Sequence, residues 1–220
     1  MGLLKMLGIG KKSGPAVPLI ILAGASRSGR KDLINRITEG FGPETRVSVV
    51  LYDLHDAEQA IRQTPNIGLH VYTHEAIKCP CHGDGSDPIR KSVKAAVRAD
   101  EPDVAILQVG RGKDSQEVLR DVVRLEGQVS LAGLTAVLNA ESALNDLRDA
   151  DDEVGSYVRA AGQVYISHVA EAQERTLEAL RKRVSEINSK AVIIEDPEKA
   201  VQNIRKQVYA AASAANRNGG

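Results

Sequence analysis

The chain has 220 residues, of which 42% are apolar and only 3% aromatic, so it can bury one sizeable core of aliphatic side chains. Basic and acidic residues balance at 29 each, which gives no general attraction for nucleic acid or for a membrane surface. No apolar run approaches the roughly 18 residues of a membrane-spanning helix. Two cysteines in a chain of this size indicate a reducing compartment, so we expect a cytoplasmic protein.

Apolar segments and amphipathic segments alternate along the whole chain. Seven segments are predicted to be β-strands: 17–24, 46–53, 68–74, 102–110, 131–140, 162–169 and 190–196. Most are continuous apolar runs, typical of strands covered on both faces, whereas 68–74 alternates apolar and polar residues and is expected near a sheet edge. Residues 114–127 and 171–190 have helical spacing, and 171–190 is expected to be the longest helix. The last helix is predicted to begin at Asp196, a capping residue, and Pro197.

Strand–helix alternation predicts an α/β fold with a mainly parallel sheet of about seven strands, flanked by helices as a three-layer sandwich. We expect a flexible leader over 1–16, a single domain over 17–213 and a disordered tail over 214–220. In such sheets, ligands bind at the carboxyl ends of the strands. The loops that follow the strands are therefore where functional residues are expected.

The loop after the first predicted strand reads GASRSGRK, residues 24–31. Backbone N–H groups of a glycine-bracketed loop, together with the following helix N-terminus, can bind an anion such as phosphate. A nucleotide site of this kind normally has Lys and then Ser or Thr after its last glycine, but here those positions hold Arg30 and Lys31. Arg30 can supply charge in a different geometry, and a charged Lys31 cannot ligate Mg²⁺. The alternative is a strand–turn–helix corner with basic residues on its surface.

The candidate anion-binding residues of this loop are Gly24, Ser26, Ser28, Gly29, Arg30 and Lys31. Asp53 follows the second predicted strand, at its carboxyl end, and is a candidate for holding a cation near the same site.

A second candidate site lies in the segment LHVYTHEAIKCPCHGDG, residues 69–85. Cys79, Cys81 and His82 place two thiolates and an imidazole within four residues, a donor set that suits Zn²⁺ or Ni²⁺. His70 and His74 share one face of the preceding strand but lie about 13 Å apart if it is extended. His74 is therefore the better fourth ligand, unless a second subunit supplies one. The alternative is a polar loop without metal.

The chain resembles the CobW/HypB/UreG-like metallochaperone GTPases over residues 17–196. GASRSGRKDLINRIT lies without gaps on the CobW-type loop Gly-Phe-Leu-Gly-x-Gly-Lys-Thr-Thr-Leu-Leu-Asn-Arg-Leu, and DLHDAE (53–58) is similar to the Gly-Asp-x-x-x-x-Asp-Ala-Glu segment of hydrogenase- and urease-maturation members. CPCHGDG falls where family members carry Cys-rich or Cys/His metal motifs. The resemblance implies a P-loop NTPase-like fold, GTP with Mg²⁺, a transition metal such as Zn or Ni, and a metalloenzyme client or maturation partner. It also suggests a homodimer.

The chain departs from the family pattern at several functional positions. Leu107 stands where the family has the Glu of Glu-x-x-Gly, and the guanine motif Asn-Lys-x-Asp is replaced by residues 168–171, His-Val-Ala-Glu. The resemblance still lets Glu171 accept hydrogen bonds from a guanine edge. With the phosphate lysine and the Mg²⁺ hydroxyl also altered, nothing orients Mg²⁺ and water as phosphoryl transfer requires. We therefore predict that hydrolysis is lost, while weak binding of a nucleotide or another anion stays open.

Three functions follow from these observations. The preferred one is a metal-binding or metallocentre-assembly protein whose nucleotide site is degenerate. The first alternative is an active GTPase in which Arg30 or Lys31 replaces the usual lysine. The second is a non-enzymatic scaffold or interaction partner that retains only the fold.

Overall fold

The computed structural model describes residues 16–25, 27–52, 61–72, 88–109, 113–125, 127–149 and 152–218. Its strands are β1 (Val17–Gly24), β2 (Val47–Tyr52), β3 (Ile67–Tyr72), β4 (Val104–Val109), β5 (Val129–Asn139), β6 (Gln163–Ser167) and β7 (Val192–Ile194). Its helices are α1 (Arg30–Phe41), α3 (Pro88–Asp100), α4 (Ser115–Val123), α5 (Ala143–Asp146), α6 (Glu153–Ala160), the short 3₁₀ turn η3 (Val169–Glu171), α7 (Glu174–Ile187) and α8 (Pro197–Asn218).

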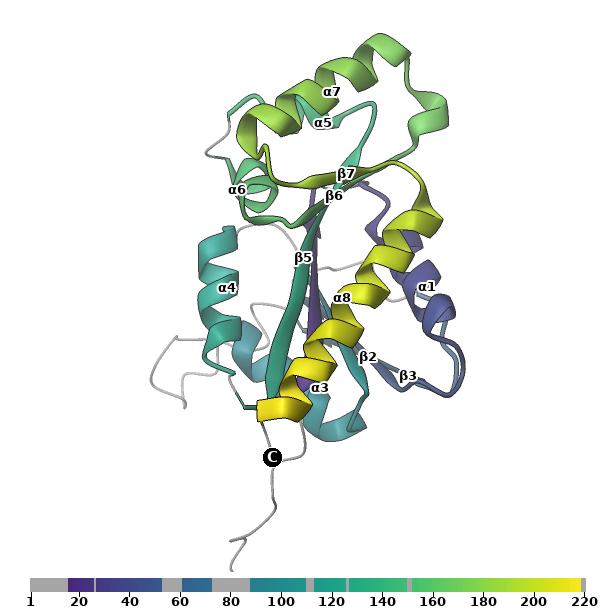
Figure 1. Cartoon of the computed structure of the whole chain (residues 1–220), viewed down its shortest axis with the longest axis vertical. Helices are drawn as coiled ribbons and strands as arrows, with labels where there is room; N and C mark the ends of the chain where they lie inside the picture. The colour runs from purple at the N-terminus through teal and green to yellow at the C-terminus, as the bar shows by residue number, and fades with distance from the viewer. Residues whose placement is uncertain are drawn as a thin grey trace, which may run out of the picture.

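The seven strands form one sheet in the order β3-β2-β4-β1-β5-β6-β7, and every strand pair is parallel (Figure 1). This confirms the predicted α/β sandwich with its seven-stranded parallel sheet. β3 is an edge strand, as its alternating sequence predicted. All seven strands lie within or close to the predicted segments, because continuous aliphatic runs of this length suit strands buried on both faces.

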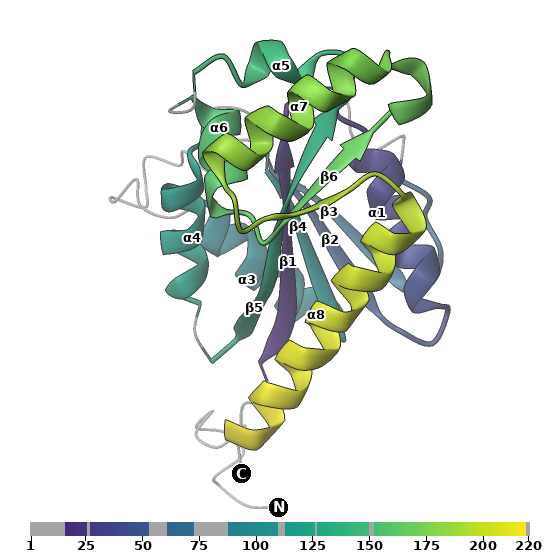
Figure 2. The ribbon, with the colours of Figure 1, turned by 45° about the horizontal axis from the view of Figure 1, so that its top comes forward.

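Alternate residues of β1 enter two separate hydrophobic cores, one on each face of the sheet. Leu19 and Ile21 pack with residues of α3, α4, α6 and α7, whereas Ile20 and Leu22 pack with α1 and α8. Figure 2 shows the same division, with α3, α4 and α6 on one side of β1 and α1 and α8 on the other. The period-two geometry of a strand makes this division.

The longest helix is α8, with 22 residues, and not α7, which has 14. The prediction that 171–190 forms the longest helix is therefore wrong. α8 begins as predicted, with Asp196 Oδ1 accepting hydrogen bonds from the N–H groups of Glu198 and Lys199. It continues to Asn218, past residue 213, because the alanine-rich sequence there favours helix. Among the described helices, none combines the length and hydrophobicity needed to cross a lipid bilayer.

The carboxyl ends of β1 and β5 approach each other closely. Gly24 ends β1 opposite Val137 of β5, and its φ of 150° is one that residues with a side chain rarely adopt. A Cβ atom at Gly24 would overlap the carbonyl oxygen of Val137. Only glycine allows the chain to turn there into the loop that leads to α1.

We expect Gly24→Ala to lower the free energy of unfolding by about 2–4 kcal/mol, because it combines backbone strain with a steric clash against a neighbouring strand. Gly127→Ala is the matched control: Gly127 also has a positive φ, 83°, but a Cβ there would meet nothing within 4 Å. The control should cost only the strain, about 1 kcal/mol. Urea unfolding monitored by circular dichroism measures both, and equal losses would contradict the role of the close approach.

Candidate functional site

The loop between β1 and α1 has the tight backbone of an anion-binding loop. Arg27 and Gly29 have φ angles of 59° and 80°, on either side of the buried Ser28. Gly29 precedes the 12-residue helix α1 and offers no side chain to cap its first N–H groups. Left-handed residues next to a helix N-terminus are the arrangement with which backbone N–H groups bind phosphate.

Side chains at the ends of β5 and β6 hold this loop from one side. The hydroxyl of Ser167 donates to the carbonyl oxygen of Ser28 at 2.8 Å, and the amide of Asn139 donates to that of Arg27 at 3.2 Å. Asn139 Oδ1 in turn accepts from the N–H groups of Glu141 and Ser142, which fixes the orientation of the amide. The carboxyl edge of the sheet thus sets the loop conformation through side-chain contacts to its backbone.

His168 extends the same network. Its Nδ1 lies 2.8 Å from the Ser167 hydroxyl and 3.3 Å from the amide nitrogen of Asn139. One ring nitrogen therefore contacts both of the side chains that hold the loop. A Cβ at Gly29 would lie 3.4 Å from Cε1 of His168, so the ring is against the loop.

Arg30 turns inward from the first turn of α1. Its side chain is 7% exposed, and Nη1 donates to the carbonyl oxygen of Val109, the last residue of β4, at 2.6 Å. The guanidinium also lies near Tyr157 of α6: burial and nearby carboxylates raise the pKa of the Tyr157 hydroxyl, and the charge of Arg30 acts in the opposite direction. The cation at the phosphate-lysine position is therefore bound to the end of a neighbouring strand.

The Tyr157 hydroxyl donates to the carbonyl oxygen of Lys113 at 2.7 Å. Lys113 lies just before Asp114, which caps α4 by accepting from the N–H groups of Gln116 and Glu117. Arg30 and Tyr157 therefore fasten the two ends of the connection that follows β4.

Two residues of β4 decide which chemistry the site can support. Leu107 is fully buried in the apolar core on the α3 and α4 face, where it pairs with Ile21, so this position provides no carboxylate. Gln108 is 1% exposed, and its Oε1 has no hydrogen-bond partner among the described residues. It lies on the α1 face, between Leu22 and Leu51 of the adjacent strands.

Of the remaining predicted nucleotide residues, the structure describes Lys31 and Glu171. Lys31 is partly buried in the first turn of α1. Glu171 is exposed at the end of η3, the turn that follows His168. Ser26 and Asp53 lie outside the described residues.

The predicted metal ligands Cys79, Cys81, His82 and His74 also lie outside the described residues. Within the described part of the chain, no three His, Cys, Asp or Glu side chains come close enough to hold a metal ion. His70 of β3 is bound to Asp100 of α3, with Nε2 and Oδ2 2.7 Å apart. This contact accounts for His70 without a metal.

The donor set fits one part of a magnesium nucleotide and not the other. Phosphate is matched by the left-handed loop, the uncapped start of α1 and the cation of Arg30. Magnesium requires oxygen ligands, but the hydroxyl position holds Lys31 and the carboxylate position holds buried Leu107. The described residues therefore fit an anion without its usual metal.

Four residues of this site were missed in the sequence. Arg27, Asn139, Ser167 and Gln108 all belong to or border the loop at the carboxyl edge. Three of them were visible as polar residues at or near the ends of apolar strands. Arg27 was visible too, since it stands where the CobW-type loop has a glycine, and its φ of 59° shows why glycine suits the position.

Arg27→Gly should raise the free energy of unfolding by up to about 1 kcal/mol, because relief of left-handed strain exceeds the added entropy of the unfolded chain. Arg27→Lys keeps both the charge and the strain and should leave stability unchanged. Urea unfolding of the two variants separates the backbone effect from the charge. A destabilised Arg27→Gly would show that the arginine side chain supports the loop.

No family model and no curated protein matches the sequence. Solved structures do match the fold. HypB, the hydrogenase maturation factor from Archaeoglobus fulgidus, is 18% identical with a TM-score of 0.58, and the match covers 88% of this chain and 91% of that one. HypB from Helicobacter pylori, in complex with nickel, is 14% identical with a TM-score of 0.57, and the match covers 91% and 89%.

The Zn(II)-bound YjiA GTPase from E. coli is 14% identical with a TM-score of 0.55, and the match covers 82% of this chain but only 57% of YjiA. At identities of 14–18%, these matches establish a shared fold and not a shared activity. The chain therefore has the P-loop GTPase fold of HypB and YjiA.

Proposed function

We propose that this protein is a metal-binding or metallocentre-assembly protein of the CobW/HypB/UreG type, in which the nucleotide site has lost hydrolysis. The observation that carries the loss of hydrolysis is the position of Arg30, which replaces the phosphate lysine and whose buried guanidinium is bound to the Val109 carbonyl. An arginine in this place can bind an anion only by leaving or sharing that contact. We infer weak binding of a phosphate-bearing ligand.

The absence of carboxylate chemistry at residue 107 supports the same proposal. Phosphoryl transfer depends on groups that position Mg²⁺ and the attacking water. Leu107 is packed in the core and Lys31 repels a cation, so neither position can take part. Glu171 is exposed in the turn that stands at the position of the guanine motif, so its carboxylate is available to accept hydrogen bonds from a guanine edge.

Metal binding is assigned to the segment with Cys79, Cys81 and His82, with His74 as fourth ligand. The support is the donor chemistry of the sequence together with the nickel and zinc named for HypB and YjiA. A metal delivered to a client would be cargo held by these residues. The partner is then a metalloenzyme or its maturation factor, and a homodimer could complete the ligand set.

The full-length protein should show no Mg²⁺-dependent GTP hydrolysis above the protein-free rate, measured as phosphate release. Arg30→Lys combined with Lys31→Thr should tighten Mg²⁺–nucleotide binding about ten-fold or more without restoring turnover, because it supplies one phosphate contact and one metal ligand but no residue for water. Arg30→Lys alone is the control for the metal ligand. Robust turnover by the unaltered protein, abolished by Arg30→Ala, would instead support an active GTPase.

Cys81→Ser should lower the affinity for Zn²⁺ or Ni²⁺ by about a hundred-fold or more, since even outer-shell partners of a metal site change affinity 10–100-fold. Competition with a chromogenic chelator measures this affinity. His70→Ala is the matched control, because His70 is bound to Asp100, and it should leave the affinity unchanged. Equal metal affinity in the Cys81→Ser protein would favour a scaffold without a metal function.

A further inference from the structure

Helix α3 packs on the sheet through one face and turns the opposite face to solvent. Its apolar residues, Ile89 and Val93 among them, are fully buried in the core that α3 shares with β2 and α4. On the other face Lys91 and Arg98 are exposed and Lys94 is partly buried. At about 100° per residue these three cations fall within an arc of about 60° and span roughly 10 Å of the helix. We call Lys91, Lys94 and Arg98 the α3 stripe.

The α3 stripe has no compensating acid on its own helix. Residues 88–99 contain Arg90 besides the stripe and no Asp or Glu, and Asp100, which ends α3, is bound to His70 of β3. Within the part of the chain that the structure describes, no ion pair or side-chain hydrogen bond reaches the three cations of the stripe. Other surface cations are paired, as Lys113 is with Glu117 of α4. The charge of the stripe is therefore open to a partner.

The same charges oppose the formation of the helix that carries them. Lys94 lies three residues from Lys91 and four from both Arg90 and Arg98, which are the spacings at which like charges repel on a helix. Arg90 and Lys91 also stand in the first turn, where the helix dipole disfavours cations and where α3 has no acidic residue. A helix shaped for stability alone would carry Glu at some of these positions. Local conflicts of this kind gather at functional surfaces.

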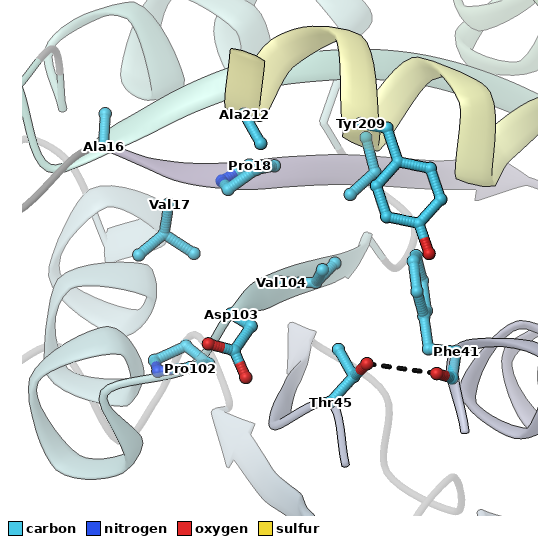
Figure 3. A pocket seen from close by; sticks show the side chains of 11 residues that line it. Ala16, Val17, Pro18, Phe41, Thr45, Pro102, Asp103, Val104, Tyr209 and Ala212 are labelled. Carbon is cyan, nitrogen blue, oxygen red and sulfur yellow. Dashed lines mark hydrogen bonds between the residues drawn. The ribbon is translucent and has the colours of Figure 1, made fainter. Parts of the chain in front are cut away.

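A hollow at the amino edge of the sheet makes a useful contrast. It measures about 350 Å³ and lies between β1, β4 and α8 (Figure 3). The rings of Phe41 and Tyr209 meet edge-on in its wall, and Val208 is already buried. Asp103, a charged residue of its lining, is paired with Arg46. These groups are satisfied within the protein, whereas the cations of the α3 stripe have no such partners among the described residues.

Carboxylates are the chemistry that fits the α3 stripe best. Lysine and arginine both bind carboxylates, and three cations within roughly 10 Å match a short run of Asp and Glu side chains. Nucleic acid fits less well, because the formal net charge of the chain is zero and α3 has no aromatic side chain on which a base could stack. A membrane also fits less well, since the exposed apolar residues of α3, Ala95 and Ala99, are too small to insert.

We propose that the α3 stripe is a docking surface for an acidic segment of a partner protein, in which carboxylates face Lys91, Lys94 and Arg98. The partner supplies the opposite charges that α3 lacks, so binding relieves the repulsion along the helix. The contacts are exposed, and the complex therefore weakens as salt is added. This surface depends on the charges of α3 and needs neither a nucleotide nor a metal, so its failure and that of the function proposed above are distinguishable.

The test measures the fluorescence anisotropy of a fluorescein-labelled deca-glutamate peptide with the full-length protein at about 20 and about 150 mM NaCl. The peptide should bind at the lower salt and bind more weakly at the higher. The combined variant Lys91→Glu, Lys94→Glu and Arg98→Glu should weaken binding about ten-fold or more, because three exposed ion pairs are replaced by repulsion. The matched control, which changes the net charge equally, reverses three exposed cations in or just after α7: Arg175→Glu, Lys182→Glu and Lys190→Glu.

A neutral variant separates docking from folding. Lys91→Gln, Lys94→Gln and Arg98→Gln together should weaken peptide binding and at the same time raise the urea concentration at the unfolding midpoint, because the like charges along α3 are removed. A variant that is more stable and binds less cannot owe its lost binding to misfolding. Unchanged peptide binding by this variant would contradict the proposal.

Equal weakening by the two charge-reversed variants would also overturn the proposal, since the peptide would then sense only the net charge. So would tighter binding of a labelled DNA duplex that the α3 variant loses, which would assign the stripe to nucleic acid. Binding to phosphatidylglycerol vesicles without binding to the peptide would assign the stripe to a membrane. Self-association that the α3 variant abolishes, measured by sedimentation and without peptide binding, would assign it to a second copy.

Discussion

The close approach of Gly24 to the Val137 carbonyl is the constraint on which the candidate site depends. A parallel sheet brings the carboxyl ends of β1, β4, β5 and β6 to one edge, and the missing side chain at Gly24 lets the chain turn sharply there. Ser167 and Asn139 can then reach the loop backbone, and α1 begins with its N–H groups at the same edge. Sheet register and one glycine therefore bring Ser167, Asn139 and the start of α1 together at the loop.

Within this loop, the cation that could contact an anion is the guanidinium of Arg30 and not the ammonium of a lysine. A guanidinium spreads its donors over a planar fork and satisfies backbone carbonyls well, whereas an ammonium is a compact point charge on a flexible stem. Its bond to Val109 ties the loop to β4, and Tyr157 ties α6 to the chain after β4. A phosphate-type loop in which Arg30 is bound to Val109 and residue 107 is a buried leucine supports our proposal that the site binds an anion without hydrolysing it.

The two edges of the sheet have different characters. The carboxyl edge gathers polar side chains and left-handed backbone, as expected where a parallel sheet binds ligands. The amino edge presents an apolar hollow between β1, β4 and α8, next to the point where the N-terminal segment joins. Strand direction causes this division. All strands of a parallel sheet end at the same edge, so the loops that follow them gather there and leave the other edge to the loops that precede the strands.

The α/β class, the parallel sheet, the edge position of β3 and the start of α8 could all be predicted from sequence, because aliphatic runs, alternation and capping residues are local signals. The two glycines that bracket the loop, Gly24 and Gly29, could also be recognised from the sequence. The sequence alone determined which side chains are available: an arginine for a lysine, a leucine for a glutamate, and a Cys/His cluster at 79–82. Only the tertiary structure decided that Arg30 turns inward to Val109 and that Ser167 and Asn139 hold the loop, because these contacts join residues that are far apart in the chain. It also decided that Arg27 is left-handed, because packing imposes that backbone angle.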